Sequence, residues 1–356
     1  MAASAALPGR THAAEPEGLQ FPADYGAHTA SRTEWWYVTG RLRTGAQTDT
    51  LTAGARMWGF QVTFFRSRTG LNDASASRFS ATELVFAHAA VTDLAGQRLR
   101  HDQRIARTGF GIAQASPGDT DVVLRDWHLK RSTAAPRASY HGLVASDSAG
   151  FALDARFTPT QPLMLQGDAG LSRKGPLAPQ TSHYYSEPQL AVQATLTLDG
   201  KPIAVQGSAW LDHEWSDAYM DPMAVGWDWI GMNLLDGSAL MAFRMRRADG
   251  SMLYAGGSFR RAAGTVRSYA PAEVQFTPGR VWVSPASRAR YPVEWRVTTP
   301  DGRFTVRALL DNQELDSRTS TGAIYWEGLS ELLDEAGARV GLGYLELTGY
   351  AGALRM

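Results

Sequence analysis

The 356-residue chain contains no cysteine. Disulfide bonds, thiolate chemistry and cysteine-ligated zinc or iron–sulfur sites are therefore excluded, although the compartment stays open because an exported protein can fold without disulfides. An excess of charge is also missing, since Lys and Arg together number 35, as do Asp and Glu. This balance argues against a nucleic-acid-binding protein, which normally carries a basic surface, and against a protein held on a membrane by charge.

Long apolar runs are absent as well. No stretch approaches the ~18 consecutive apolar residues of a membrane-spanning helix, so no integral membrane segment is expected. Residues 1–24 are small and polar, with neither the basic start nor the apolar centre of an intact signal peptide. Two interpretations of this segment stay open: a disordered tail, or the remnant of a longer export signal.

The sequence also has almost no helical periodicity, and the one helix it predicts is short, over residues 329–336. Instead, apolar and polar residues alternate through many short segments, such as residues 59–66, 151–157 and 190–198. Residues 158–182 have no period and carry four prolines, which predicts a long loop. These patterns predict an all-β protein.

A weak internal repeat indicates two similar halves. A Trp-rich strand over residues 34–38 is followed by a strand that ends in Phe-Arg, and the same order recurs from residue 227 to residue 244. Two antiparallel β-barrels or sandwiches in tandem would explain the repeat. On this interpretation Trp36 and Trp229 are plugs at the bottoms of the two barrels.

Residues 210–217 combine carboxylates, an imidazole and indoles more densely than any other part of the chain. In a strand, Trp210, Asp212 and Glu214 share one face, and His213 and Trp215 share the other. The two carboxyl groups would lie ~6–7 Å apart, close enough to shift each other's pKa. A structural alternative stays open, in which both carboxylates only accept hydrogen bonds from a neighbouring turn.

Other titratable residues have a structural and a functional interpretation. His88 lies on an apolar strand face, which favours a hydrogen-bonded core histidine over a group that orients a carboxyl. Glu34 is predicted to form a buried ion pair with Arg66, and a role in a site is the alternative. Glu327 and Glu346 are unresolved candidates in the second half.

Metal binding and serine hydrolysis are not predicted. His88, His183, Asp212, His213 and Glu214 could converge on zinc or iron, but no tight ligand spacing such as HExxH is present. The chain also lacks the Gly-x-Ser-x-Gly elbow of serine hydrolases and a glycine loop that could hold a phosphate. We therefore expect no metal ligands and no cofactor.

The chain resembles bacterial predicted secreted hydrolases, which are relatives of carotenoid 1,2-hydratase (hydroxyneurosporene synthase). The resemblance runs from about residue 21 to the C-terminus, and its motifs are Thr33-Glu34-Trp35-Trp36-Tyr37, Gly59-Phe60-Gln61-Val62-Thr63-Phe64-Phe65-Arg66, Phe86-Ala87-His88, Ser172-Arg173-Lys174-Gly175, Tyr184-Tyr185-Ser186, Ala209-Trp210-Leu211-Asp212-His213-Glu214-Trp215, Gly226-Trp227-Asp228-Trp229 and Gly343-Tyr344-Leu345-Glu346-Leu347-Thr348-Gly349-Tyr350.

This resemblance implies two tandem lipocalin-like antiparallel β-barrels. The N-terminal domain would cover residues 25–218 and the C-terminal domain residues 219–356, after the tail of residues 1–24. The resemblance also implies a periplasmic or secreted location, and it leaves the oligomeric state open. A ligand site would lie near the interface between the barrels, which is a common place for one.

The hydratase relatives add water to an isolated C=C bond of an isoprenoid, which needs a desolvated acid, aromatic faces for the carbocation and a positioned water. Asp212 is the first choice for the acid, and Glu214 or His213 would orient the water. The predicted ligand-binding residues are Trp35, Tyr185, Trp210, Trp215, His88 and Glu34.

Two alternatives to hydration stay open at the level of the sequence. The first is a non-catalytic carrier of an apolar small molecule, in which the carboxylates only hold the barrels together. The second is a hydrolase of unknown specificity, as the family's general description implies.

Overall fold

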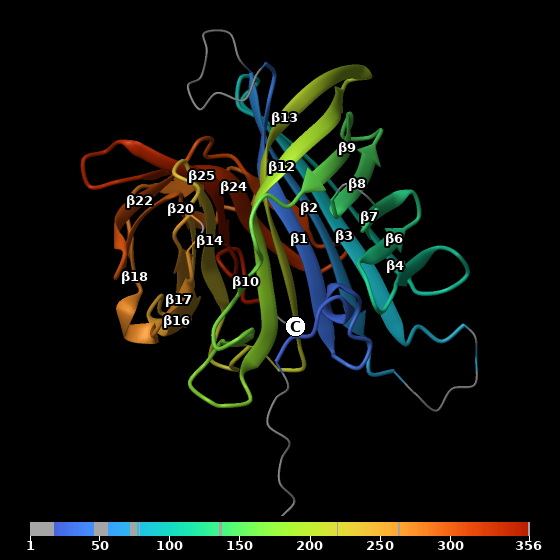
Figure 1. The fold of residues 1–356 in the computed structure, drawn as a ribbon, viewed down its shortest axis with the longest axis horizontal. Helices are drawn as coiled ribbons and strands as arrows, with labels where there is room; N and C mark the ends of the chain where they lie inside the picture. Colours follow the sequence, from blue (N-terminus) through green and yellow to red (C-terminus); the bar gives the residue numbers. More distant parts are fainter. Residues whose placement is uncertain are drawn as a thin grey trace, which may run out of the picture.

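The computed structural model describes residues 18–45, 56–71, 77, 79–134, 137–218, 220–262 and 264–354. Within these residues the protein consists of two large antiparallel sheets and one two-stranded sheet (Figure 1). The only helices of the described residues are two short 3-10 turns, η1 (Ala23–Tyr25) and η2 (Pro271–Glu273). The all-β prediction is therefore confirmed.

The first sheet has 13 strands, and the order along its main path is β4-β3-β2-β1-β13-β12-β9-β8-β7-β6-β5. Residues of β3 and β4 contact β5 and β6 at the other end of this path, so the sheet curls into a nearly closed barrel. The strands are β1 (Thr33–Arg43), β2 (Met57–Arg68), β3 (Glu83–Asp93), β4 (Arg98–Arg107), β5 (Ala113–Ala115), β6 (Asp121–Leu124), β7 (Trp127–Ser132), β8 (Ser139–Ser146), β9 (Phe151–Thr158), β10 (Met164–Leu165), β11 (Leu171–Arg173), β12 (Thr181–Leu198) and β13 (Lys201–Ser216).

The second sheet has 10 strands in the order β17-β16-β15-β14-β25-β24-β22-β21-β18, with β23 paired to β24. Its strands are β14 (Gly226–Leu234), β15 (Ala239–Arg246), β16 (Met252–Arg260), β17 (Val266–Tyr269), β18 (Gln275–Pro278), β21 (Glu294–Thr299), β22 (Gly302–Ala308), β23 (Glu314–Ser317), β24 (Ala323–Leu333) and β25 (Arg339–Leu347). The small third sheet pairs β19 (Val281–Val283) with β20 (Arg290–Pro292).

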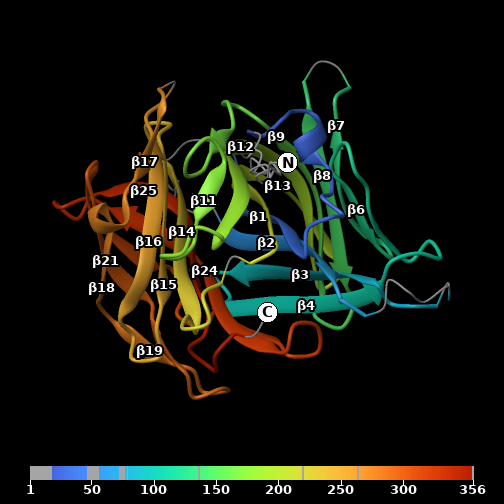
Figure 2. The ribbon, with the colours of Figure 1, turned by 90° about the horizontal axis from the view of Figure 1, so that it is seen from below.

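The two large sheets lie side by side, and strands β1 and β13 of the first contact β25 and β14 of the second (Figures 1 and 2). A separate apolar cluster fills the space between them; we call this contact region the seam. Its buried members are Tyr37, Met57, Met164, Tyr184, Trp210, Ala224, Trp229, Ala239, Met241, Phe243, Met245, Leu329, Leu342 and Tyr344. Strands at the seam are therefore buried on both faces, which removes the simple alternation of apolar and polar residues.

This double burial explains why the predicted helix over residues 329–336 is wrong. Most of that segment belongs to β24, where Leu329 packs into the seam and Leu332 into the core of the second sheet. Apolar residues on both faces of a strand give a run without a period of two, and such a run cannot be told from a short helix by periodicity.

Two further interpretations need correction. Residues 158–182, predicted as a loop, contain the short strands β10 and β11. Both pair with β12, which begins at Thr181 and not at residue 190 as the alternation predicts. Trp36 lies in the core of the first sheet, but Trp229 packs edge-on against Tyr37 and Trp210 in the seam and is no plug of the second sheet.

The chain passes from the first sheet to the second between Ser216 and Gly226. The predicted division into residues 25–218 and 219–356 as domains stays a prediction. Among the described residues no helix is long and apolar enough to cross a membrane.

Candidate functional site

Strand β13 carries the candidate site, because it runs between β1 and β12 at the seam. Its side chains alternate as the sequence predicts: Trp210 packs into the seam, whereas Leu211 and Trp215 pack into the core of the first sheet. The strand therefore presents two polar clusters, one on each face. We call them the seam cluster and the barrel cluster.

In the seam cluster, Asp212 is buried among neutral hydrogen-bond donors. Trp210 Nε1 donates to its Oδ1 at 2.7 Å, Ser186 Oγ donates to the same oxygen at 2.5 Å, and Tyr184 OH donates to Oδ2 at 2.8 Å. Burial raises the pKa of Asp212 to about 7, against the three hydrogen bonds, which lower it. This carboxyl can therefore hold a proton near neutral pH.

Glu214, two residues further along the same face, has a charged partner instead. Lys174 Nζ lies 2.9 Å from its Oε1, and the hydroxyl of Ser182 donates to the same oxygen. The ammonium of Lys174 also lies 4.5 Å from the ring centres of Tyr184 and Phe243. Glu214 is thus held by an ion pair in the seam, whereas none of the hydrogen-bond donors to Asp212 is charged.

Two carboxyl groups of the second sheet face the same region. Glu327 of β24 and Glu346 of β25 are directly opposite each other in the strand register. Burial, together with the charge of Glu346, raises the pKa of Glu327 well above its usual range. Burial also raises the pKa of Glu346 to about 7, and the charges of Asp212 and Glu214 add to this effect. The seam therefore holds three carboxyl groups with a raised pKa, those of Asp212, Glu327 and Glu346.

In the barrel cluster, His213 bridges two polar groups across the core of the first sheet. Its Nε2 lies 2.9 Å from Glu34 Oε1, and its Nδ1 lies 3.1 Å from Tyr185 OH. The ring stacks on Trp36 with centroids 4.5 Å apart. Burial lowers the pKa of His213, which favours the neutral imidazole.

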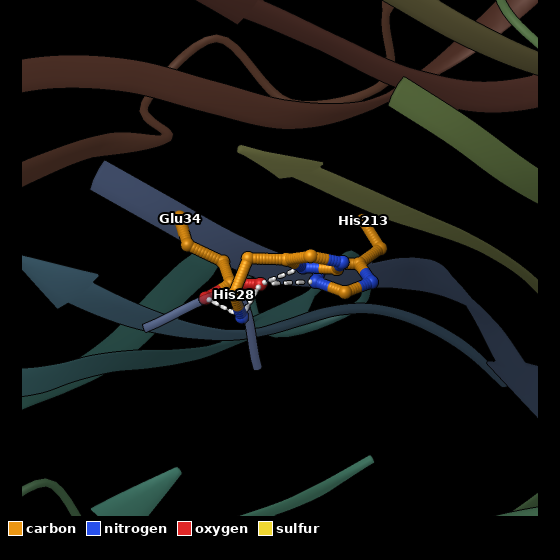
Figure 3. Close-up of side chains that lie close together, drawn as sticks. All are labelled: His28, Glu34 and His213. Atoms are coloured by element: carbon orange, nitrogen blue, oxygen red, sulfur yellow. Dashed lines mark hydrogen bonds and ion pairs between the residues drawn. The ribbon is translucent and has the colours of Figure 1, made fainter. Parts of the chain in front are cut away.

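Glu34 is the centre of the barrel cluster, where it meets His28 and His213 (Figure 3). The predicted ion pair of Glu34 with Arg66 is confirmed. Arg66 Nε donates to Oε2 at 2.8 Å, while Oε1 meets His28 Nδ1 at 2.8 Å and His213 Nε2 at 2.9 Å. Burial alone would raise the pKa of Glu34, but the hydrogen bonds from His213 and His28 lower it to about 2. This carboxylate is therefore ionised.

The remaining predicted residues lie in three places: at the seam, in the core of the first sheet, and, for His88, at a separate contact between the two sheets. Trp35 packs at the seam, while Tyr185 and Trp215 belong to the core of the first sheet. His88 forms hydrogen bonds of 2.8 Å with Tyr325 OH and with Ser320, so it is a hydrogen-bonded core residue that links the two sheets. Burial lowers the pKa of His88 to about 3.

The predicted residues thus do not converge on one site. Asp212, Glu214, Trp210 and Trp35 lie at the seam, whereas His213 projects into the first sheet on the other side of β13. The ring nitrogens of His213 consequently meet Tyr185 and Glu34, and not the carboxylates of Asp212 and Glu214, its neighbours in the sequence.

Sequence reasoning missed the partners that set the properties of both clusters. Tyr184 and Ser186 reach Asp212 because β12 and β13 pair in a register that places Ser186 opposite Asp212. His28 lies in the irregular segment before β1, where no periodic pattern marks it. The Tyr184-Tyr185-Ser186 motif was visible, but only the strand register shows which of its side chains face the carboxylate.

The seam also holds a small gap of about 10 Å³, lined by residues that include Thr39, Trp210, Asn233 and Leu342. Pockets for drug-sized ligands usually measure about 300 Å³ or more. In this conformation the gap has room for about one water molecule, so a larger group can enter only if the two sheets move apart.

The two large antiparallel sheets, the first of them a nearly closed barrel, and the polar strand β13 at the seam agree with the lipocalin-like all-β class that the sequence motifs predicted. More specifically, the chain belongs to the AttH-like family, whose model matches residues 12–350.

Solved structures agree with this assignment. A protein of Nitrosomonas europaea, proposed to be an AttH, is 47% identical with a TM-score of 0.83, over 94% of this chain and 98% of that one. Kievitone hydratase of Nectria haematococca is 14% identical with a TM-score of 0.71, over 94% of each chain. CghA in complex with Sch210972 is 12% identical with a TM-score of 0.50, over 90% of this chain and 89% of that one. The comparison with curated proteins gave no match.

Proposed function

We propose that the two sheets move apart at the seam to admit the apolar end of an isoprenoid- or lipid-like molecule, and that Asp212 protonates an isolated C=C bond there so that water adds to it. The observation that carries this proposal is the setting of Asp212: a buried carboxyl that accepts three hydrogen bonds from neutral donors, beside two indole rings. The reaction needs no cofactor.

The chemistry follows from these groups. The Asp212 proton is transferred to the less substituted alkene carbon, which leaves a tertiary carbocation and an Asp212 carboxylate. The faces of Trp210 and Trp229 stabilise the cation, and a water molecule then attacks it. The water gives up a proton to the Asp212 carboxylate, which restores the acid. Tyr184, Ser186 and the Trp210 indole N–H hold the carboxylate in place during the cycle.

A protein of the same fold is named for this class of reaction. Kievitone hydratase has the same fold and is by its name an enzyme that adds water. At 14% identity the comparison carries the fold alone, so the reaction rests on the residues of the seam. The periplasmic or secreted location implied by the sequence motifs is part of the same proposal.

A carrier protein is the second candidate, and the ion pair between Lys174 and Glu214 favours it. This pair is buried, with both side chains 7% exposed. The ion pair joins Lys174, in the segment before β12, to Glu214 of β13 at the seam, so it can serve to fix the packing of the sheets. In a carrier the same apolar molecule would bind at the seam and leave unchanged.

The deciding experiment starts with mass spectrometry of small molecules extracted from the purified protein, which identifies the compound class. The wild type and Asp212→Asn are then incubated with an unsaturated member of that class in oxygen-18 water. We expect the wild type to form a labelled alcohol and Asp212→Asn to be slower by at least about 100-fold, because general acid catalysis contributes roughly 100- to 10,000-fold.

The matched control is Asp154→Asn, the same change at a side chain that is 60% exposed and lies on β9. This variant should keep the wild-type rate. An unchanged rate in Asp212→Asn rules out Asp212 as the acid. A wild type that binds the compound and incorporates no label identifies a carrier.

A further inference from the structure

The barrel cluster has a composition that the proposed function does not use. His28, Glu34 and His213 come from the segment before β1, from β1 and from β13, and their ligand atoms all lie within 4.8 Å of one another. We propose that these three side chains bind one divalent transition-metal ion of the zinc class, through His28 Nδ1, Glu34 Oε1 and His213 Nε2. This site is separate from the seam, because it lies on the opposite face of β13.

The distances suit such an ion after a small adjustment. Glu34 Oε1 lies 2.8 Å from His28 Nδ1 and 2.9 Å from His213 Nε2 (Figure 3). Metal–ligand bonds of about 2.0–2.2 Å hold neighbouring ligand atoms roughly 3.0–3.5 Å apart. The carboxylate oxygen therefore has to withdraw from each nitrogen by only a few tenths of an ångström, and the two nitrogens lie within 4.8 Å of each other. Two imidazoles and one carboxylate form a ligand set found in zinc hydrolases and non-haem iron proteins.

Each ligand also has the outer partner that metal sites require. The second nitrogen of His28 lies 3.1 Å from Asp24 Oδ1, and that of His213 lies 3.1 Å from Tyr185 OH. The second oxygen of Glu34 is bound by Arg66 at 2.8 Å. Such partners fix the tautomer and the orientation of a ligand, and losing one typically costs 10- to 100-fold in metal affinity.

The backbone and a neighbouring indole hold His28 in this position. Its backbone N–H donates to both oxygens of Glu34, at 3.1 and 3.0 Å, and Arg66 Nη2 donates to its carbonyl at 2.6 Å. Its ring stacks on Trp215 with a centroid distance of 3.6 Å and an interplanar angle of 6°. Hydrogen bonds and ring stacking therefore hold the ligand that comes from the irregular segment.

The charge around the cluster favours a cation. The carboxylates of Glu34 and Glu83 pair with the guanidinium of Arg66, and the carboxylate of Asp24 contacts His28. Among these groups negative charge exceeds positive charge when both imidazoles are neutral. A dication balances this excess, because its attraction to the carboxylates outweighs its repulsion from Arg66. His28 and Asp24 keep part of their side chains exposed, at 21% and 18%, which gives an ion a path from solvent to the buried carboxylate.

The test is a titration of chelator-treated full-length protein with Zn²⁺, followed by calorimetry and by the melting temperature. We expect one ion per chain and a rise in melting temperature, because an ion that binds only the folded state stabilises it. His28→Ala should lower the affinity at least about 100-fold and abolish the rise. His28 lies outside the sheets, so the variant should still fold, which its circular dichroism spectrum checks.

The matched control is His183→Ala. This imidazole also stacks on the indole of Trp215, with ring centroids 5.3 Å apart, and is not part of the cluster. The control should bind Zn²⁺ as the wild type does. Co²⁺ should quench the fluorescence of Trp215 in the wild type and in His183→Ala, but not in His28→Ala.

A second pair of histidines in the first sheet is the alternative place where Zn²⁺ could bind, and the test distinguishes the two. His128 Nε2 and His141 Nδ1 lie 3.0 Å apart, and His141 also contacts Asp154. The proposal is overturned if binding is lost in His141→Ala and kept in His28→Ala, or if the wild type binds no Zn²⁺ after chelator treatment. X-ray absorption of the Zn²⁺-loaded wild type should show two imidazole ligands, and a spectrum without imidazole would equally overturn it.

Discussion

A buried carboxyl group lies at each face of β13, and the pKa values of these two groups are shifted in opposite directions. On the barrel face, Glu34 meets a guanidinium and two imidazoles, and its pKa falls to about 2. On the seam face, Asp212 meets two hydroxyls and an indole, and its pKa rises to about 7. Both carboxyls are almost fully buried, so the partners and not the depth of burial decide the difference.

This contrast separates two uses of a buried carboxyl group. An ionised carboxylate with a bonded guanidinium holds structure in place and can attract a cation. A carboxyl that neutral donors surround keeps its proton, which is the state an acid catalyst needs at neutral pH. The comparison can be tested by removing partners on either face.

The largest effect is expected on the barrel face, from Arg66→Met. The substitution leaves the buried carboxylate of Glu34 without its guanidinium, and breaking a buried ion pair from one side costs about 3–5 kcal/mol. Urea unfolding of the variant measures this loss. Arg318→Met is the control, because its pair with Asp316 is 65% and 47% exposed and should change stability by less than about 1 kcal/mol. Equal losses in both variants would contradict the comparison.

A smaller effect of opposite sign is expected on the seam face, from Glu327→Gln. The pKa of Glu327 is raised in the folded protein, so the folded state binds more protons than the unfolded state above the usual glutamate pKa. Stability should therefore fall as the pH rises from about 4.5 through the raised pKa, by about 1.4 kcal/mol for each unit of pKa difference.

The amide of Glu327→Gln carries no charge opposite Glu346, so the variant should be more stable than the wild type at pH 8 and differ less from it at pH 4. Melting temperatures across this range measure the effect. Glu335→Gln is the control, since that side chain is 70% exposed. A variant that is destabilised at pH 8 would show that Glu327 is ionised and paired in the folded protein.

The smallest effect is expected from Tyr184→Phe, which removes one of the three hydrogen bonds to Asp212. A hydrogen bond of this kind contributes roughly 0.5–1.5 kcal/mol, and the ring that packs in the seam is kept. Because the lost bond favours the ionised form, the pKa of Asp212 should rise further. Urea unfolding at pH 6 and pH 8 measures both changes, and a loss as large as that of Arg66→Met would refute the contrast between the faces.

Much of the fold could be predicted from the sequence. Short alternating segments identified most of the strands, and the alternation around residues 210–215 gave the correct face for Trp210, Leu211 and Trp215. The pairing of Glu34 with Arg66 was also predicted, because both belong to strands with clear patterns. The prediction failed at residues 329–333, where two sheets bury both faces of one strand.

The division into two clusters could not be predicted. His213 stands between Asp212 and Glu214 in the sequence, and the three were expected to act together. A strand directs adjacent side chains to opposite faces, and the second sheet then encloses only one of those faces. When a strand is buried on both faces, titratable residues that are adjacent in its sequence do not form one site. Their density along the chain is therefore a poor predictor of a functional site.

By itself, the sequence determined the class of fold, the family and the face on which each side chain of β13 lies, because these depend on local alternation and on motifs within short segments. The tertiary structure alone decided the chemistry of each face. Tyr184 and Ser186 reach Asp212 through strand register, and His28 reaches Glu34 from an irregular segment. The pKa of a buried group depends on the atoms within a few ångströms of it, and these come from distant parts of the chain.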